Sequence, residues 1–357
     1  MKIAFLNIYG GRVFRGAETA VHEIAKRLGR IHDVSVFQSE TVKNTTYTIH
    51  AFHRMPYIST EVDNNLILRI LKKIYLDPYS LLVLYFSLRS LPVLLKNKSD
   101  ILIPVNGFWQ IIICKIIGNL NKSKVIVPGF AGIGTDDYIN LKLAPSAFFA
   151  MTKTAAKWAK TVNNRIPIKV LPGGVNTTIF NPRAKPMKLP LKPPIVLIVS
   201  ALQPYKRVDL VIKAVAQLPN VSLIVAGNGI LKREIENLGL RLMPSRFLRI
   251  DIDYINLPSL YTACNVFTLP SKSQEAFGIV YLEAMSCGLP IVAPDDELRH
   301  EIIGNAGIFV DCTDIDQYAQ ALKKALSFKG NNILQEQAEK FTWEKIVANF
   351  SQDLESI

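Results

Sequence analysis

Short apolar runs alternate with helical patterns along the chain. Lys2–Ile8 is mainly apolar and leads through Gly10 and Gly11 into residues 17–28, whose apolar positions recur every three or four residues. Asp33–Gln38 is then a second short strand. A strand, a glycine turn, a helix and a strand in this order predict the opening of a doubly wound α/β sheet.

The same alternation restarts after a proline-rich segment. Residues 181–194 contain five prolines and no periodic pattern, which is typical of a linker. We therefore predict an N-terminal Rossmann-like domain over 1–172, a linker over 173–194, a second Rossmann-like domain over 195–340 and a final helical segment over 341–357. Ligands of such sheets bind at the carboxyl ends of the strands, so we expect the functional loops in a cleft between the domains.

The pattern predicts a series of further strands and helices. Strands are expected at 101–105, 124–127, 146–152, 169–171, 195–200, 222–226, 247–250, 266–269, 290–293 and 308–310. Helices are expected at 153–160, 208–218, 231–238, 257–264, 277–286, 316–326 and 343–354.

Residues 66–95 are strongly apolar but contain scattered charges. Asp77-Pro78 predicts a break, so we expect two helices here. The basic residues leave no uncharged run of the ~18 residues that a membrane span requires. Core helices of an α/β domain and basic amphipathic helices on a membrane surface both remain open for this segment.

Composition excludes several classes of protein. The 357 residues are 49% apolar and 20% charged, which is typical of globular domains. The four cysteines and five histidines are scattered, so we expect no metal site and no disulfide framework. The first residues read as a strand rather than a signal peptide, and we therefore expect a reduced, cytoplasmic protein.

The net charge of +13 lies entirely in the first half of the chain. Residues 1–180 carry 23 Lys and Arg against 10 Asp and Glu, whereas the remainder carries 19 of each sign. Such asymmetry favours an acidic partner for the first half: nucleic acid, an anionic membrane surface or a phosphorylated substrate. An ordinary solvated basic surface is the alternative. Nucleic acid is disfavoured because the basic half has no interleaved aromatics or recognisable nucleic-acid motif.

Two glutamates dominate the candidate chemistry. Glu275 and Glu283 are eight residues apart, a spacing that on a helix returns to nearly the same face ~12 Å further along. Two carboxylates at that separation could hold the hexose and ribose hydroxyls of a nucleotide sugar. Between them, the backbone N–H groups of Phe277, Gly278 and Ile279 could hold its phosphates at a helix N-terminus.

A pair of cations follows the strand at 195–200. Lys206 and Arg207 stand in the loop before the next helix, where they would neutralise a diphosphate as it leaves. Segment 275–290 closely resembles the E-x7-E motif of the large family of retaining glycosyltransferases known as GT4. Lys206 matches the lysine of that family, whereas the family arginine falls on Ala201, and Arg207 could replace its charge. The wording around Lys206 resembles a subgroup that includes O-antigen-type mannosyltransferases.

The resemblance implies further donor-side and acceptor-side residues. On the donor side these are the glycine-rich loop, the Gly-Asn-Gly turn and the segment that holds the nucleobase in relatives: Gly11, Gly16, Gly227, Asn228, Ile252 and Asp253. On the acceptor side they lie in the loop after 124–127: Gly129, Asp136 and Asp137. Many relatives place a histidine in this loop, where this chain has Phe130. An N-cap role is an alternative for at least one of the two aspartates.

The resemblance implies a GT-B fold, with two Rossmann-like domains facing across a cleft and a C-terminal helix that crosses back to the first. Its implied activity is transfer of a hexose, with mannose from GDP-mannose favoured, to a glycan or polyprenyl-linked glycan in cell-surface polysaccharide synthesis. Glu275, Lys206 and Arg207 would be catalytic, and no cofactor is implied beyond the nucleotide-sugar donor. The basic first domain suggests work at the inner face of the plasma membrane.

Two other functions stay open. An epimerase or a phosphorylase could use the same two-domain architecture, although no lysine can be identified as the site of a pyridoxal cofactor. A non-catalytic scaffold that binds sugar nucleotides is motivated by Ala201 and Phe130, where the family residues are absent. The presence of Glu275, Glu283 and Lys206 argues against it.

Overall fold

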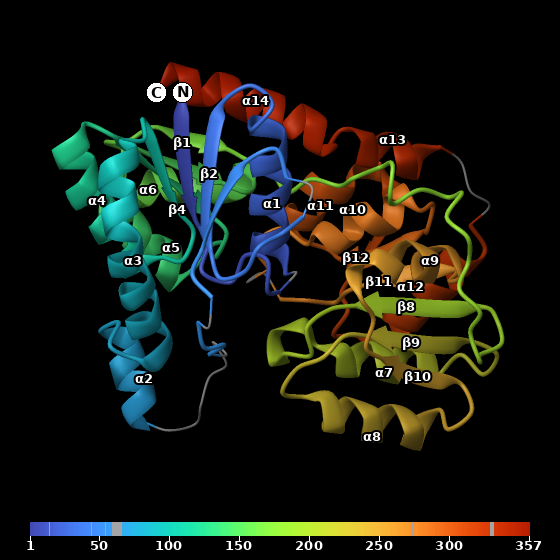
Figure 1. Cartoon of the computed structure of the whole chain (residues 1–357). Coiled ribbons are helices and arrows are strands. Elements are labelled where there is room, and N and C mark those ends of the chain that lie inside the picture. Colours follow the sequence, from blue (N-terminus) through green and yellow to red (C-terminus); the bar gives the residue numbers. More distant parts are fainter. Residues whose placement is uncertain (14, 44, 54, 59–65, 273–274, 329–331) are drawn as a thin grey trace. The chain divides into compact units, whose positions relative to one another are not determined.

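The computed structural model describes residues 1–13, 15–43, 45–53, 55–58, 66–272, 275–328 and 332–357. They form two compact units, the first made of Met1–Pro172 with Trp343–Ile357 and the second of Gly173–Thr342 (Figure 1). Each unit has its own parallel sheet. The prediction of two parallel α/β domains is therefore confirmed.

The first unit is built on seven strands in the order β3-β2-β1-β4-β5-β6-β7. Neighbouring strands are parallel throughout, with Lys2 opposite Asp33 and Leu6 opposite Phe37 in the β1–β2 pair. The strands are β1 (Lys2–Leu6), β2 (Asp33–Gln38), β3 (Thr48–Ala51), β4 (Ile101–Pro104), β5 (Lys124–Gly129), β6 (Ala147–Ala150) and β7 (Ile168–Val170).

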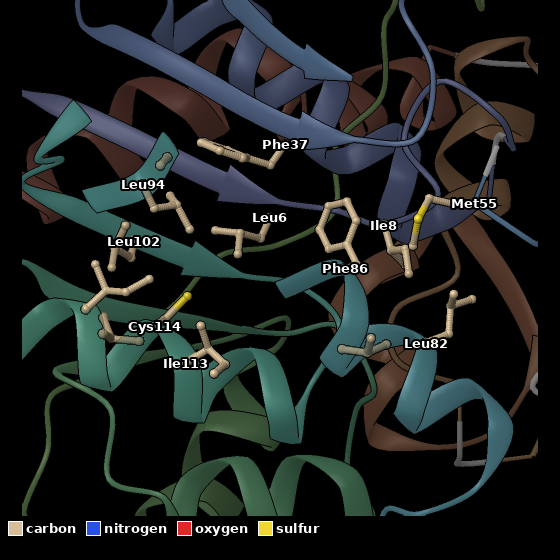
Figure 2. Packing of buried hydrophobic residues seen from close by; sticks show 14 of the residues in the cluster. Leu6, Ile8, Phe37, Met55, Leu82, Phe86, Leu94, Leu102, Ile113 and Cys114 are labelled. Carbon is tan, nitrogen blue, oxygen red and sulfur yellow. The ribbon is translucent and has the colours of Figure 1, made fainter. Parts of the chain in front are cut away.

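Helices cover this sheet. They are α1 (Gly16–Leu28), α2 (Leu66–Lys73), α3 (Pro78–Asn97), α4 (Phe108–Asn121), α5 (Thr135–Lys142), α6 (Lys153–Val162) and α14 (Trp343–Ser356). Figure 2 shows how α3 and α4 pack on the sheet: Phe86 and Ile113 lie in one apolar cluster with Leu6 and Leu102. The central strands β1, β4 and β6 are nearly continuous apolar runs, as is typical of a parallel sheet that helices cover on both faces.

The predicted break at Asp77-Pro78 is confirmed. The carboxylate of Asp77 accepts hydrogen bonds from the backbone N–H groups of Tyr79 (3.2 Å) and Ser80 (3.4 Å), so it caps α3, and Pro78 occupies its first turn. Residues 66–97 taken together are long and apolar enough to cross a membrane by length and composition. The core helix of a soluble protein passes the same test, and α3 buries one side in the cluster of Figure 2.

The last helix, α14, belongs to the first unit although the second unit precedes it in the chain. Phe350 meets the ring of Phe149 edge-on, with centroids 4.9 Å apart. Glu344 accepts from Arg27 of α1 (2.7 Å), and Lys169 donates to Asp353 (2.7 Å). The apolar stripe of α14 thus completes the core of the first unit.

The second unit has six parallel strands in the order β10-β9-β8-β11-β12-β13. The strands are β8 (Ile195–Val199), β9 (Ser222–Ala226), β10 (Phe247–Ile250), β11 (Val266–Thr268), β12 (Ile291–Pro294) and β13 (Gly307–Val310). The helices are α7 (Val208–Ala216), α8 (Lys232–Leu242), α9 (Leu257–Thr262), α10 (Ile279–Ser286), α11 (Glu297–Ile303), α12 (Ile315–Leu326) and α13 (Ile333–Glu339). Because β8 and β11 are neighbours, the loops that leave their carboxyl ends lie side by side.

Candidate active site

Lys206 and Glu275 meet in the second unit. Lys206 ends a short 3-10 turn (Pro204–Lys206) after β8, and Glu275 lies in the loop after β11. The ammonium of Lys206 donates a hydrogen bond to the carboxylate of Glu275. The backbone N–H of Lys272 also donates to the carbonyl of Tyr205 (2.9 Å), which ties the two loops together. The two charged side chains are 11% and 13% exposed, so their charges are poorly screened by solvent.

The two glutamates of the motif do not share a helical face, and that expectation is wrong. The helix α10 begins only at Ile279, after Gly278 with φ +89°. A Cβ at Gly278 would lie 2.9 Å from the ring of Tyr281, so a side chain there would be strained in two ways. Glu275 therefore stands in the loop and Glu283 on the helix.

The first residues of α10 offer their backbone rather than their side chains. The ring of Phe277 is 3% exposed and packs edge-on against Phe341, with centroids 5.9 Å apart. The first N–H groups of any helix have no acceptor inside that helix and favour an anion. Ile279 is the first residue of α10, Gly278 is its N-cap and Phe277 lies one residue before it. All three remain candidates for phosphate binding through the main chain.

Glu283 is buried, with 4% of its surface exposed. Its carboxylate accepts a hydrogen bond from the hydroxyl of Tyr261 on α9 (2.9 Å). Burial raises the pKa of Glu283 to about 7, and the hydrogen bond from Tyr261 opposes part of that rise. The sequence alone did not indicate Tyr261, because a tyrosine 22 residues before the glutamate carries no local signal of this contact.

Arg207 differs from Lys206 in its contacts. It has a left-handed backbone (φ +50°), and its Nε donates to the carbonyl of Pro270 (2.6 Å). The guanidinium thus holds the start of the loop that carries Glu275. Ala201, at the position of the family arginine, is exposed.

A second arginine, which the sequence analysis missed, braces the same loop. Arg299 of α11 is fully buried and pairs with Asp296 (2.8 Å). It also donates to the carbonyl oxygens of Ser271 (2.8 Å) and Lys272 (3.2 Å). Arg207 and Arg299 together fix the backbone at the start of this loop, from Pro270 to Lys272.

The Gly-Asn-Gly turn packs against the loop after β8. Gly227 has φ +145°, and a Cβ there would lie 1.9 Å from the carbonyl oxygen of Ser200. The carbonyl of Asn228 accepts from the N–H of Leu202 (2.8 Å). Only glycine permits this approach. Ile252 and Asp253 follow β10, the next strand outward, and Asp253 is exposed.

The predicted residues of the first unit gather at the carboxyl ends of β1 and β5. Gly11 (φ +76°) would place a Cβ 2.7 Å from the carbonyl oxygen of Glu40, so the turn requires glycine. A Cβ at Gly129 would lie 2.6 Å from the ring of Phe148. By contrast, a Cβ at Gly16 would meet no described atom within 4 Å, so packing does not require that glycine.

The two aspartates of α5 have different surroundings. Gly134, not an aspartate, is the N-cap residue of α5, and Asp136 is exposed. Asp137 is 1% exposed and accepts from the side-chain amide of Asn140 (3.0 Å). Its carboxylate also accepts from the backbone N–H groups of the loop before α5, at Ala131 and Gly132. Burial raises the pKa of Asp137 to about 7.

Both aspartates line a cavity of about 590 Å³, which we call the first-unit cavity. Phe130, at the position of the family histidine, also lines it, as do the cationic side chains of Arg15, Arg69 and Lys72. Its aromatic wall includes Tyr75 and Phe108, whose rings stack with centroids 4.3 Å apart. Its remaining acidic lining residues are Glu18 and Asp77. The cavity thus combines cations, carboxylates and a flat aromatic face.

Comparisons with known proteins find a family match in the second unit. Residues 182–342 match the family model described as "Glycosyl transferases group 1". A D-inositol 3-phosphate glycosyltransferase of Mycobacterium avium is 32% identical over 169 residues, which cover 43% of this chain and 40% of that protein. A GDP-mannose-dependent alpha-(1-6)-phosphatidylinositol monomannoside mannosyltransferase of Mycolicibacterium smegmatis is 29% identical over 203 residues, covering 50% of this chain and 52% of the relative. The chain thus covers only about half of the length of each of these relatives, or less.

Solved structures resemble the whole chain. Anabaena Alr3699/HepE in complex with UDP and glucose superimposes with a TM-score of 0.76 at 19% identity, covering 100% of both chains. Sucrose-phosphate synthase of Thermosynechococcus elongatus gives a TM-score of 0.75 at 18% identity, covering 99% of this chain and 98% of the other. The fold is GT-B, and the predicted family is confirmed for the second unit.

Proposed function

We propose that this chain, whose residues 182–342 belong to the glycosyl transferases group 1, is a retaining glycosyltransferase that moves a hexose from a nucleotide-diphosphate sugar to a glycan or lipid-linked glycan. The observation that carries the proposal is the contact between Lys206 and Glu275 at the carboxyl ends of β8 and β11. Ligands of open parallel sheets bind at this edge, and the contact lies inside the matched segment.

Each polar group has a defined task in the proposed mechanism. Glu275 accepts hydrogen bonds from hexose hydroxyls, and Glu283 accepts them from the ribose. Lys206 and the N-terminus of α10 stabilise the negative charge that grows on the diphosphate as its bond to the sugar breaks. The leaving phosphate takes the proton of the attacking acceptor hydroxyl, so the new bond forms on the face that the phosphate leaves.

Arg207 has a supporting role in this mechanism. Its hydrogen bond to Pro270 fixes the loop of Glu275, and its positive charge lies one residue from Lys206. We propose that this charge replaces that of the family arginine, whose position Ala201 occupies in this chain. Exposure of Ala201, with no cation at that position, is also the observation that favours the alternative of a non-catalytic scaffold.

Mannose from GDP-mannose is the donor we favour. The M. smegmatis relative is named as GDP-mannose-dependent, and the wording of 204–209 supports the same donor. The first-unit cavity supports an acceptor that carries phosphate beside sugar hydroxyls, because three cations that can bind phosphate line it together with four acidic residues that can accept from hydroxyls. We place this reaction at the cytoplasmic face of a membrane, in cell-surface polysaccharide synthesis.

The charge of the first half supports association with an anionic membrane. We expect the chain to bind vesicles that contain phosphatidylglycerol, and this binding should weaken as salt is added. Equal binding to neutral phosphatidylcholine vesicles would contradict the electrostatic basis of this association.

A donor panel tests the activity. The chain is incubated with GDP-mannose, UDP-glucose, UDP-galactose or ADP-glucose and a prenyl-diphosphate-linked N-acetylglucosamine, and products are measured by mass spectrometry and NMR. We expect one donor to give a product whose new linkage keeps the donor's anomeric configuration. An inverted product would refute the mechanism. Nucleotide binding without transfer or donor hydrolysis would favour the scaffold.

A further inference from the structure

The helix α2 has two faces of opposite character. At about 100° per residue, Leu66, Ile67 and Ile70 fall within an arc of about 100°, which we call the outer face. Their exposed fractions are 67%, 66% and 52%, and α2 has no buried residue. Three exposed aliphatic side chains on one side of a helix leave apolar surface in water, which burial against another apolar surface would relieve.

The opposite arc of α2 belongs to the first-unit cavity. Leu68, Arg69 and Lys72 line the cavity, and we call them the inner face. At about 100° per residue, these three positions lie on the side of the helix opposite the outer face. Lys73 follows Lys72 directly but lies at the edge of the outer face and does not line the cavity. Two adjacent lysines thus belong to different surfaces.

The rest of the cavity suits a phosphorylated sugar. The carboxylate of Glu18, a residue 6% exposed, receives a hydrogen bond from Arg15 (2.8 Å) on one oxygen, whereas the other is buried without a partner among the described residues. Such an oxygen can accept a hydrogen bond from a sugar hydroxyl. The stacked rings of Tyr75 and Phe108 offer an apolar face, and the inner face offers cations to a phosphate.

The neighbouring helix α3 also carries exposed apolar side chains. Leu81, Tyr85 and Leu88 of α3 are 45–52% exposed and recur at the i, i+4, i+7 spacing of one helical face. Between Leu66 and Asn97 the sequence holds five Lys and Arg, whereas Asp77 is its one acidic residue. Exposed apolar residues flanked by cations complement an anionic bilayer, which offers both acyl chains and negative headgroups.

We propose that α2 docks on an anionic bilayer through its outer face while its inner face holds the phosphate of a lipid-linked acceptor, so that membrane contact and acceptor entry occur at one helix. This inference rests on the proposed function. A helix is about 10–12 Å across, so an acceptor whose lipid stays in the bilayer has to extend only that distance to reach the cavity.

Vesicle binding tests the outer face without requiring catalysis. Co-sedimentation is measured with vesicles of equal parts phosphatidylcholine and phosphatidylglycerol. We expect Ile70→Asp to weaken binding about tenfold, because it places a charge in the apolar contact. Ile31→Asp is the matched control, since Ile31 is 63% exposed in the first unit outside α2. Equal loss in both variants, or no loss in Ile70→Asp, would overturn the docking assignment.

The adjacent lysines test the two faces against each other. We expect Lys73→Ala to weaken vesicle binding more than transfer to a water-soluble short-chain prenyl diphosphate sugar. Lys72→Ala should instead reduce that transfer about tenfold, with a smaller effect on vesicle binding. The same pattern in both variants would refute the two-faced assignment. Absence of transfer by the unmodified chain, with Ile70-dependent vesicle binding intact, would refute the proposed function and the acceptor role but not the docking.

Discussion

At the scale of single residues, the candidate site combines a partly exposed ion pair, Lys206 with Glu275, and a buried carboxylate, Glu283. The sequence indicated Glu275, Glu283 and Lys206, because the motif and the loop lysine are local patterns. It did not indicate Tyr261 or Arg299, whose contacts depend on chain segments that only the fold brings together. It also predicted a helix from residue 277 and a shared face for the two glutamates, whereas α10 begins at Ile279, after the left-handed Gly278, and leaves Glu275 in the loop.

The buried Glu283 predicts a pH dependence of stability. Its folded-state pKa of about 7 exceeds the ordinary value of 4.5, so the folded protein binds the proton more tightly than the unfolded chain. This contribution is full below pH 4.5 and is lost as the pH rises through 7. We expect Glu283→Gln to reduce the loss of unfolding free energy between pH 5 and pH 8 by roughly 2 kcal/mol. Denaturant titrations measure it, with the exposed Glu234→Gln as control; an unchanged profile would contradict the assignment.

Lys206 predicts a defect in transfer. Lys206→Met removes the cation beside the leaving diphosphate and strands the carboxylate of Glu275, so we expect kcat to fall about 100-fold or more. Lys206→Arg should recover part of the rate. The control is Lys213→Met, which breaks the exposed pair with Asp209 on α7 (2.7 Å). Similar rates for Lys206→Met and Lys213→Met would remove Lys206 from the mechanism.

At the scale of elements, the strands were more predictable than the helices. Apolar runs such as that of β8 give short, well-bounded signals, and the break before α3 follows from Asp77 and Pro78. The sequence pattern did not predict β3, α4, α5, α11 or α13. The helix α4 is apolar nearly all round, so it shows no helical period, and α11 and α13 have only seven residues each.

The start of α10 predicts a coupled loss of stability and binding. Gly278→Ala imposes a side chain at φ +89° and 2.9 Å from the ring of Tyr281. We expect the second unit to lose about 1–2 kcal/mol of unfolding free energy, and its affinity for nucleotide to fall, because the N–H groups shift. Thermal unfolding with and without nucleotide measures both. Gly134→Ala, where a Cβ meets no described atom within 4 Å, is the stability control; a Gly278→Ala variant as stable and as tight as this control would contradict the account.

At the scale of the whole molecule, the last helix of the chain, α14, returns to the first unit. Composition and the linker indicated two domains, and the family resemblance implied that the last helix returns to the first, which is confirmed. Its particular contacts with α1 and β6 needed the structure, because these partners are hundreds of residues away in sequence. The uneven distribution of charge is also a property of the whole molecule, because the entire net charge of +13 lies in residues 1–180.

The returning helix predicts a defect confined to one unit. Phe350→Ala removes a side chain that is 3% exposed and packs on Phe149, so we expect the first unit to lose about 3 kcal/mol. Hydrogen exchange measured by mass spectrometry should speed up in β1 and β6 and stay unchanged in β8 and β9. Glu355→Ala, at an exposed position of the same helix, is the control. Equal acceleration in both units would show that α14 does not belong to the first alone.

The central claim is that the second unit binds a nucleotide sugar between Lys206 and Glu283. The most direct measurement is a thermal-shift titration with GDP, UDP, ADP and their sugar conjugates, repeated on Lys206→Met and Glu283→Ala against each variant's own unliganded Tm. At about 100 times its Kd, a ligand should add about 2.7 kcal/mol of stability. We predict that one nucleotide stabilises the unmodified chain and that both variants lose the effect. Stabilisation by none of them, or equal stabilisation of all three proteins, would contradict the claim.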